Sequence, residues 1–166
     1  MYLGTQFRAR NDDDYRVLAQ LGVDHICGWP EEQHREWTAD SLSHYREKVE
    51  SFGLALDMIA LPFEARLIGS EGSLAEFPNI MLGRSPERDR EIDRICEMVE
   101  ACSKAGIPAA KYNLSLLPVI RSQRTRGRGG SSNSTLRWAE IDQNAPPTIA
   151  GVVSADTFWA RIDYFL

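Results

Sequence analysis

The sequence lacks the features that would assign it to a membrane-spanning, secreted or nucleotide-binding class. No apolar run approaches the roughly 20 residues that a membrane span requires, and the N-terminus has neither the basic start nor the long apolar core of a secretory signal. The three cysteines have no C-x-x-C spacing, so we expect reduced, structural thiols in a cytoplasmic protein. The chain also contains no Gly-x-Gly-x-x-Gly turn, no Walker-type phosphate loop and no Gly-x-Ser-x-Gly nucleophile motif.

Acidic residues outnumber basic ones, and the chain has only three histidines. The formal net charge of −5 disfavours general nucleic-acid binding. Of the three histidines, His25 alternates with apolar residues and is expected in the core, whereas His34 and His44 lie in polar stretches and are expected to be exposed. No cluster of His, Cys, Asp and Glu has the spacing of a divalent metal site. We therefore expect no metal ligands in this chain and no nucleic-acid or membrane partner.

What the sequence does contain is a repeated pattern of helix, glycine and strand. The 166 residues are 43% apolar and 26% charged, which is typical of one globular domain. At three joints an amphipathic helix ends, a glycine follows and an aliphatic run begins: Leu21-Gly22-Val23, Phe52-Gly53-Leu54 and Ala105-Gly106-Ile107. This repeat predicts parallel strands joined by crossover helices.

The same pattern predicts the positions of four strands and four helices. Strands are expected at 3–7, 23–27 and 54–61 and from 107 to about 113, and helices at 11–21, 40–52, 85–105 and 155–166. Ser85 is expected to cap the third helix, with Pro86 at its first position. Residues 63–83 and the polar stretch after Leu114 are predicted to be irregular.

Two architectures fit four consecutive βα units. One is an open doubly wound sheet, and the other is the first half of an eight-unit barrel. The absence of a Gly-x-Gly-x-x-Gly turn favours the barrel. The last helix favours it too, because it ends on Phe165 and Leu166 without a cap. We predict an α/β fold, a partial (β/α)8 TIM barrel of about four units, with residues 1–166 as the N-terminal part of a single domain cut within helix 155–166. An open sheet edge leaves room for a homo-oligomer.

Polar side chains at the carboxyl ends of the predicted strands are the candidate site. Arginine clamps carboxylates and an amide reads hydroxyls, so this mixture suits a small polyhydroxylated acid. Structural roles are the alternative. The arginines of the loop could simply be solvated, Trp29 could cover the rim of the barrel, and Tyr112 could pack in the interior. Asp57 and Lys111, on adjacent strands, are candidates for a buried ion pair. The candidate substrate-binding residues are Arg8, Trp29, Glu64, Tyr112, Asn113 and Arg124.

The segment Tyr112-Asn113-Leu114-Ser115-Leu116-Leu117-Pro118-Val119, followed by Arg124-Thr125, resembles mannonate dehydratases of the xylose-isomerase-like barrel group. That family carries Tyr-Asn-Phe-x-Pro-Val and then Trp-Thr-Arg-Thr. Leu61-Pro62-Phe63-Glu64 resembles the family's Leu-Pro-Val-His-Glu stretch. The chain departs from the family pattern at three places. Two extra residues lie between Asn113 and Pro118, and Arg121 and Ser122 replace the family's acidic residue and tryptophan. The histidine that precedes the glutamate in the family is absent before Glu64.

The resemblance implies a lyase that dehydrates D-mannonate to 2-keto-3-deoxy-D-gluconate in sugar-acid metabolism such as glucuronate catabolism. It also implies Mn²⁺ or Fe²⁺, bound by residues on later strands outside these 166 residues, so this chain alone is expected to be inactive. A sugar isomerase or epimerase on the same scaffold, or a non-catalytic module that binds an anion or a partner protein, are the alternatives.

Overall fold

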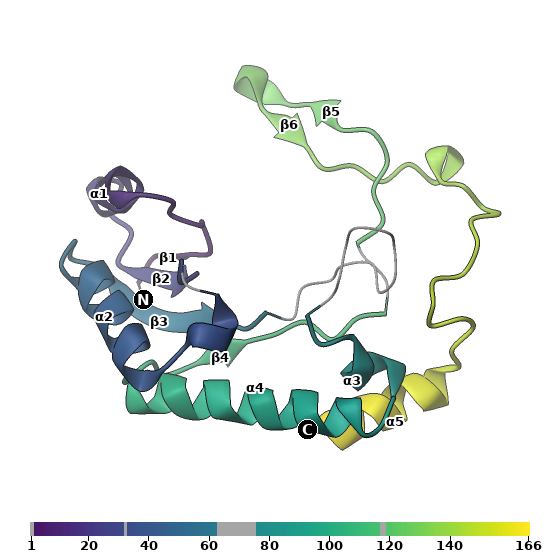
Figure 1. Ribbon diagram of the computed structural model, residues 1–166. Coiled ribbons are helices and arrows are strands. Elements are labelled where there is room, and N and C mark those ends of the chain that lie inside the picture. The colour runs from purple at the N-terminus through teal and green to yellow at the C-terminus, as the bar shows by residue number, and fades with distance from the viewer. Residues whose placement is uncertain (1, 32, 63–75, 117–118) are drawn as a thin grey trace.

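A four-stranded parallel sheet forms the centre of the molecule (Figure 1). The computed structural model describes residues 2–31, 33–62, 76–116 and 119–166. Neighbouring strands run parallel in the order β1-β2-β3-β4, with Gly4 opposite His25, Ile26 opposite Leu56 and Ala60 opposite Lys111 in the register. The strands are β1 (Gly4–Thr5), β2 (His25–Gly28), β3 (Ala55–Ala60) and β4 (Ala110–Lys111).

Helices connect successive strands, as the repeated pattern predicts. Asn11 caps α1 by accepting a hydrogen bond from the backbone N–H of Asp14, and Thr38 and Ser41 cap α2 reciprocally. The helices are α1 (Asp12–Gln20), α2 (Ala39–Glu50), α3 (Pro78–Leu82), α4 (Glu87–Lys104) and α5 (Ala155–Phe165), with short 3₁₀ turns η1 (His34–Glu36), η2 (Arg128–Gly130) and η3 (Trp138–Glu140). The predicted α/β fold with parallel strands is confirmed.

The three helix–glycine–strand joints are built alike. Gly22, Gly53 and Gly106 have φ of 77°, 79° and 73°, which is a left-handed conformation that glycine adopts without a steric penalty. Each glycine thereby ends its helix and turns the chain into the next strand. The sequence pattern therefore predicts the correct joints for a physical reason.

The hydrophobic core lies between the sheet and the helices that cover its outer face. Ile26, Leu56 and Ile59 point from the strands into this layer, and Leu42 and Val49 meet them from α2. Burying each such side chain contributes about 1.5–3 kcal/mol. The opposite face of the sheet is concave and carries no helices in Figure 1.

Helices α3 and α5 pack at the N-terminal end of α4. Glu91 of α4 accepts hydrogen bonds from Asn79 Nδ2 at 2.6 Å and from the backbone N–H of Ile80 at 3.0 Å. Arg161 of α5 donates to the carbonyl of Met81 at 2.6 Å, and the Tyr164 hydroxyl donates to Asp89 Oδ1 at 2.9 Å. Polar contacts thus hold α3 against α4 and hold α5 against both.

Three local predictions differ from the structure. Residues 63–83 were predicted to be irregular, but α3 forms at their end because Pro78 starts a turn whose apolar residues are buried. Ser85 does not cap α4: Pro86 takes that position, and the Ser85 hydroxyl donates to Asp89 Oδ2 instead. The polar stretch after Leu114 contains an antiparallel hairpin of β5 (Thr125–Arg126) and β6 (Ser132–Asn133).

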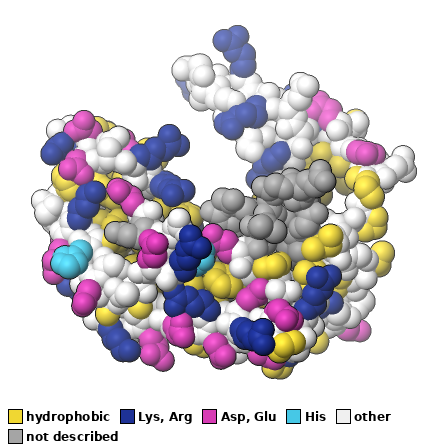
Figure 2. Space-filling model, in the orientation of Figure 1, with side chains coloured by type: hydrophobic (Ala, Val, Ile, Leu, Met, Phe, Trp, Pro, Cys, Tyr) yellow, Lys and Arg dark blue, Asp and Glu magenta, His cyan; other side chains and the backbone are white. Residues whose placement is uncertain are grey.

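This hairpin stands away from the sheet, and we call residues 119–136 the arm (Figure 1). Figure 2 shows a hollow between the arm and the part of the molecule that carries α1, with Lys and Arg side chains on both sides of it. Among the described residues, no helix has both the length and the apolar composition needed to cross a bilayer. Cys27, Cys96 and Cys102 are all unbonded.

Candidate functional site

Three side chains meet where β1, β2 and β4 end. Trp29 directly follows β2, and its ring centroid lies 5.8 Å from Cζ of Arg8, which follows β1. The ammonium of Lys111, the last residue of β4, lies 5.2 Å from the same centroid. Aromatic rings attract cations, so Trp29 holds two positive charges at this edge of the sheet.

A hydroxyl group on α2 fixes the position of Trp29. Tyr45 accepts a hydrogen bond from the backbone N–H of Trp29 at 2.9 Å. Burial, together with the nearby Tyr15 hydroxyl, raises the pKa of Tyr45 above its usual range, so the phenol stays protonated. Gly28 permits this approach, because a Cβ there would lie 2.5 Å from Leu56 Cδ1 and 2.8 Å from Tyr45 Cε1.

Next to Trp29 is a cavity of about 290 Å³, which we call the carboxyl-end cavity. Arg8 and Trp29 form one part of its wall, and His34 with Glu76 forms another, with 2.7 Å between His34 Nδ1 and Glu76 Oε2. The expectation that His34 is exposed is wrong, since this pairing and its neighbour Phe77 leave the side chain half-buried. The cavity therefore presents a guanidinium, an indole and a carboxylate–imidazole pair to a ligand.

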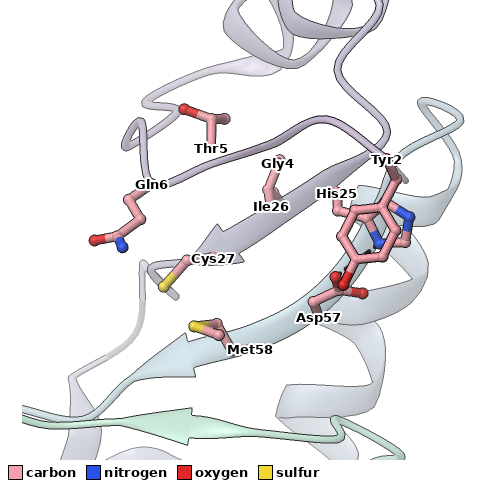
Figure 3. A pocket seen from close by; sticks show the side chains of 9 residues that line it. All are labelled: Tyr2, Gly4, Thr5, Gln6, His25, Ile26, Cys27, Asp57 and Met58. Carbon is pink, nitrogen blue, oxygen red and sulfur yellow. Dashed lines mark ion pairs between the residues drawn. The ribbon is translucent and has the colours of Figure 1, made fainter.

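A second cavity of about 260 Å³ lies on the inner face of the sheet (Figure 3). His25 Nδ1 is 2.7 Å from Asp57 Oδ2, and the Tyr2 ring lies over His25 with 3.7 Å between centroids. The predicted pairing of Asp57 with Lys111 is wrong, because Asp57 faces His25 and the Lys111 ammonium bonds to the Gln6 side chain. His25 itself is half-buried on this open face rather than enclosed in the core.

Cys27 on the same inner face is a buried, unbonded thiol. Burial raises its pKa, and the ammonium of Lys111 opposes that shift only in part. A protonated thiol is a poor nucleophile, so Cys27 is suited to packing rather than to covalent chemistry.

Three other predicted substrate-binding residues, Tyr112, Asn113 and Arg124, do not line the carboxyl-end cavity. Tyr112 follows β4 but meets Phe165 of α5 edge to face, with 5.4 Å between ring centroids. Asn113 is exposed beside it. Arg124 lies in the arm, where it donates to the Ser132 hydroxyl at 2.8 Å and to the Ser132 carbonyl at 2.9 Å. Glu64 lies outside the described residues.

Arg8 gives the carboxyl-end cavity a group that can bind an anion. A guanidinium donates two parallel hydrogen bonds to a carboxylate, and Arg8 is exposed at the cavity with its packing partner already in place. Within the described parts of the chain, no group of three or more His, Cys, Asp or Glu side chains is arranged to hold a metal ion.

The parallel sheet with its outer helices is part of a TIM-barrel-like fold. A crystal structure of mannonate dehydratase from Streptococcus suis serotype 2 matches it with a TM-score of 0.65 and 19% sequence identity. The match covers 99% of this chain and 48% of that chain, so this chain spans about half the length of the solved structure. Because the sequence identity is so low, the structural similarity shows a shared fold and nothing more. No family model and no curated protein matches the sequence.

The sequence predicts that Arg8 and Trp29 lie at this edge of the sheet, but it gives no sign of Tyr45, which positions Trp29. Tyr45 lies within the predicted helix 40–52, and nothing in the sequence distinguishes a tyrosine that packs from one that also accepts a hydrogen bond. The Trp29 backbone N–H is its partner, and a backbone group carries no sequence signal.

Proposed function

We propose that this chain provides part of the substrate-binding half of a barrel enzyme that removes water from a sugar acid, as mannonate dehydratases do. One observation carries the proposal: Arg8 and Trp29 are held together at the carboxyl end of a parallel sheet, beside a cavity of about 290 Å³. In barrel enzymes this end of the sheet is where substrates bind. The fold shared with the dehydratase from Streptococcus suis adds support.

In this proposal Arg8 binds the carboxylate of the substrate. Trp29 supports the guanidinium from beside it, and Tyr45 in turn holds Trp29 in place. Polar groups further along the cavity, such as the His34–Glu76 pair, contact the hydroxyl groups of the sugar acid. Tyr112, Asn113, Glu64 and Arg124 remain proposed substrate-binding residues. No step is assigned to Mn²⁺ or Fe²⁺, and the cytoplasm is the proposed location.

Calorimetric titration tests this assignment on the 166-residue chain. We expect D-mannonate to bind and D-mannitol, its uncharged counterpart, to bind at least about tenfold more weakly, because a hydrogen bond to a charged group contributes about 1.5–3 kcal/mol. Arg8→Gln removes this preference. Arg84→Gln, at an exposed arginine outside the cavity, is the matched control and leaves binding unchanged. Equal affinity for acid and alcohol would refute the role of Arg8.

The product formed by an active protein that contains this chain identifies the reaction. A dehydratase converts D-mannonate to a product that lacks one water, whereas an isomerase or epimerase leaves the mass unchanged. Mass spectrometry of the reaction mixture therefore separates the proposed chemistry from its closest alternative on the same scaffold.

A further inference from the structure

Lys111 carries a positive charge that no acidic side chain of the described residues neutralises. The chain has 24 Asp and Glu against 19 Lys and Arg, so acidic groups are plentiful. Lys111 is nevertheless half-buried at the end of β4 with its ammonium bonded to the neutral side chain of Gln6. Removing an ammonium from water without an opposite charge beside it is costly. Lys111 is therefore suited to pair with an anion that binds from outside.

The acidic side chains around this edge of the sheet already have other partners. Those that line the carboxyl-end cavity and the inner-face cavity each face a basic side chain, so none is left for Lys111. Arg8, the other cation beside Trp29, forms no ion pair with a described carboxylate either. The pairs are Glu76 with His34, Glu31 with Lys48 and Asp57 with His25.

The two unpaired cations lie close together because both contact one aromatic ring. The Trp29 centroid is 5.8 Å from Cζ of Arg8 and 5.2 Å from Nζ of Lys111, so the two charges are separated by no more than the sum of these distances. Like charges this close repel each other. A molecule with a negative group at each end relieves that repulsion. In an extended six-carbon acid the end groups are roughly 6–7 Å apart, since carbon–carbon bonds are about 1.5 Å long, and this span allows one molecule to contact both cations.

We propose that the site takes a sugar acid with an anionic group at each end, and that Lys111 binds the second of these groups. Arg8 binds the first at the carboxyl-end cavity, as in the proposed function, on which this inference rests. The second lies on the other side of Trp29, where Lys111 meets Gln6 at the wall of the inner-face cavity (Figure 3). It is a carboxylate or a phosphate, because an ammonium binds either of them as a point charge.

Calorimetric titration of the 166-residue chain at constant ionic strength tests the proposal. The ligands are D-mannonate, D-mannarate, which has a carboxylate at both ends, and D-mannonate 6-phosphate. We expect at least one of the two doubly anionic acids to bind about tenfold or more tightly than D-mannonate, because a hydrogen bond to a charged group contributes strongly. The one that binds more tightly identifies the second group.

Three variants assign the preference to Lys111. Lys111→Gln removes the advantage of the doubly anionic acids over D-mannonate, whereas Lys111→Arg keeps the charge and retains it. Lys104→Gln makes the same change in net charge at an exposed lysine at the end of α4 and leaves all three affinities unchanged. Far-UV circular dichroism confirms that each variant is folded.

D-mannitol separates a failure of this inference from a failure of the proposed function. If D-mannonate binds more tightly than D-mannitol but neither doubly anionic acid binds more tightly than D-mannonate, this inference is overturned and the role of Arg8 stands. An advantage of the doubly anionic acids that survives in Lys111→Gln would also overturn it, since another group would then bind the second anion. Equal affinity for D-mannonate and D-mannitol would refute the proposed function and this inference with it.

Discussion

At the scale of single residues, the candidate site depends on Tyr45 as much as on the residues that would meet a ligand. Its hydroxyl is buried between α2 and the end of β2, where it accepts from the Trp29 N–H and lies 3.5 Å from the Tyr15 hydroxyl. Gly28 leaves no room for a side chain between Leu56 and Tyr45. The position of Trp29, and through it that of Arg8, is thus set by the helix layer.

Tyr45→Phe tests this dependence. The substitution leaves the Trp29 N–H without its acceptor, and we expect a loss of about 1–3 kcal/mol in the free energy of unfolding. Urea denaturation followed by circular dichroism measures it. Tyr2→Phe is the control, because the exposed Tyr2 contributes a ring contact to His25 that phenylalanine keeps. A change in Tyr45→Phe no larger than in Tyr2→Phe would contradict the proposed role of the hydroxyl.

At the scale of elements, Glu91 joins α3 to α4. Its two carboxylate oxygens accept from Asn79 and from the Ile80 N–H, so one acidic side chain holds the start of the short helix. Burial raises the pKa of Glu91, and these hydrogen bonds lower it by less. A carboxyl whose pKa is higher in the folded than in the unfolded state stabilises the fold most at low pH.

The raised pKa of Glu91 determines how its contribution to stability changes with pH. The contribution of Glu91 is fully present below its unfolded pKa, for which the ordinary value is 4.5, and is lost as pH rises through the higher folded value. Glu91→Gln does not ionise, so the stability difference between wild type and variant should narrow between about pH 4 and pH 7. Denaturation at several pH values measures it, with Glu100→Gln on the exposed side of α4 as control. A difference that widens with pH would show that the hydrogen bonds outweigh burial.

The elements also show what a sequence can and cannot predict. The helix–glycine–strand joints were predicted correctly because the requirement for positive φ is local to Gly22, Gly53 and Gly106. The hairpin at Thr125 and Asn133 was not, because its short strands consist of polar residues without alternation. The partner of Asp57 on the inner face was also predicted incorrectly. Asp57 pairs with His25 and not with Lys111, and only the distances in the folded structure decide between the two.

At the scale of the whole molecule, shape divides the chain into two parts. The sheet and its helices bury one face, and the arm forms one side of the hollow in Figure 2. Of the predicted site, Arg8 and Trp29 share one cavity, whereas Arg124 belongs to the arm. The sequence could not predict this separation, because the strand order places Arg8 and Trp29 together while only the course of a long loop decides where Arg124 lies.

The most direct test of the central claim, that the edge of the sheet at Arg8 and Trp29 binds a sugar acid, is nuclear magnetic resonance of the tryptophan indoles. Trp29 and Trp37 both line the carboxyl-end cavity, Trp29 beside Arg8, whereas Trp159 on α5 is exposed and serves as an internal reference. We predict that the Trp29 indole resonance shifts and saturates as D-mannonate is added, while that of Trp159 does not move and D-mannitol has no effect. A Trp29 resonance that stays unchanged at saturating D-mannonate would contradict the claim.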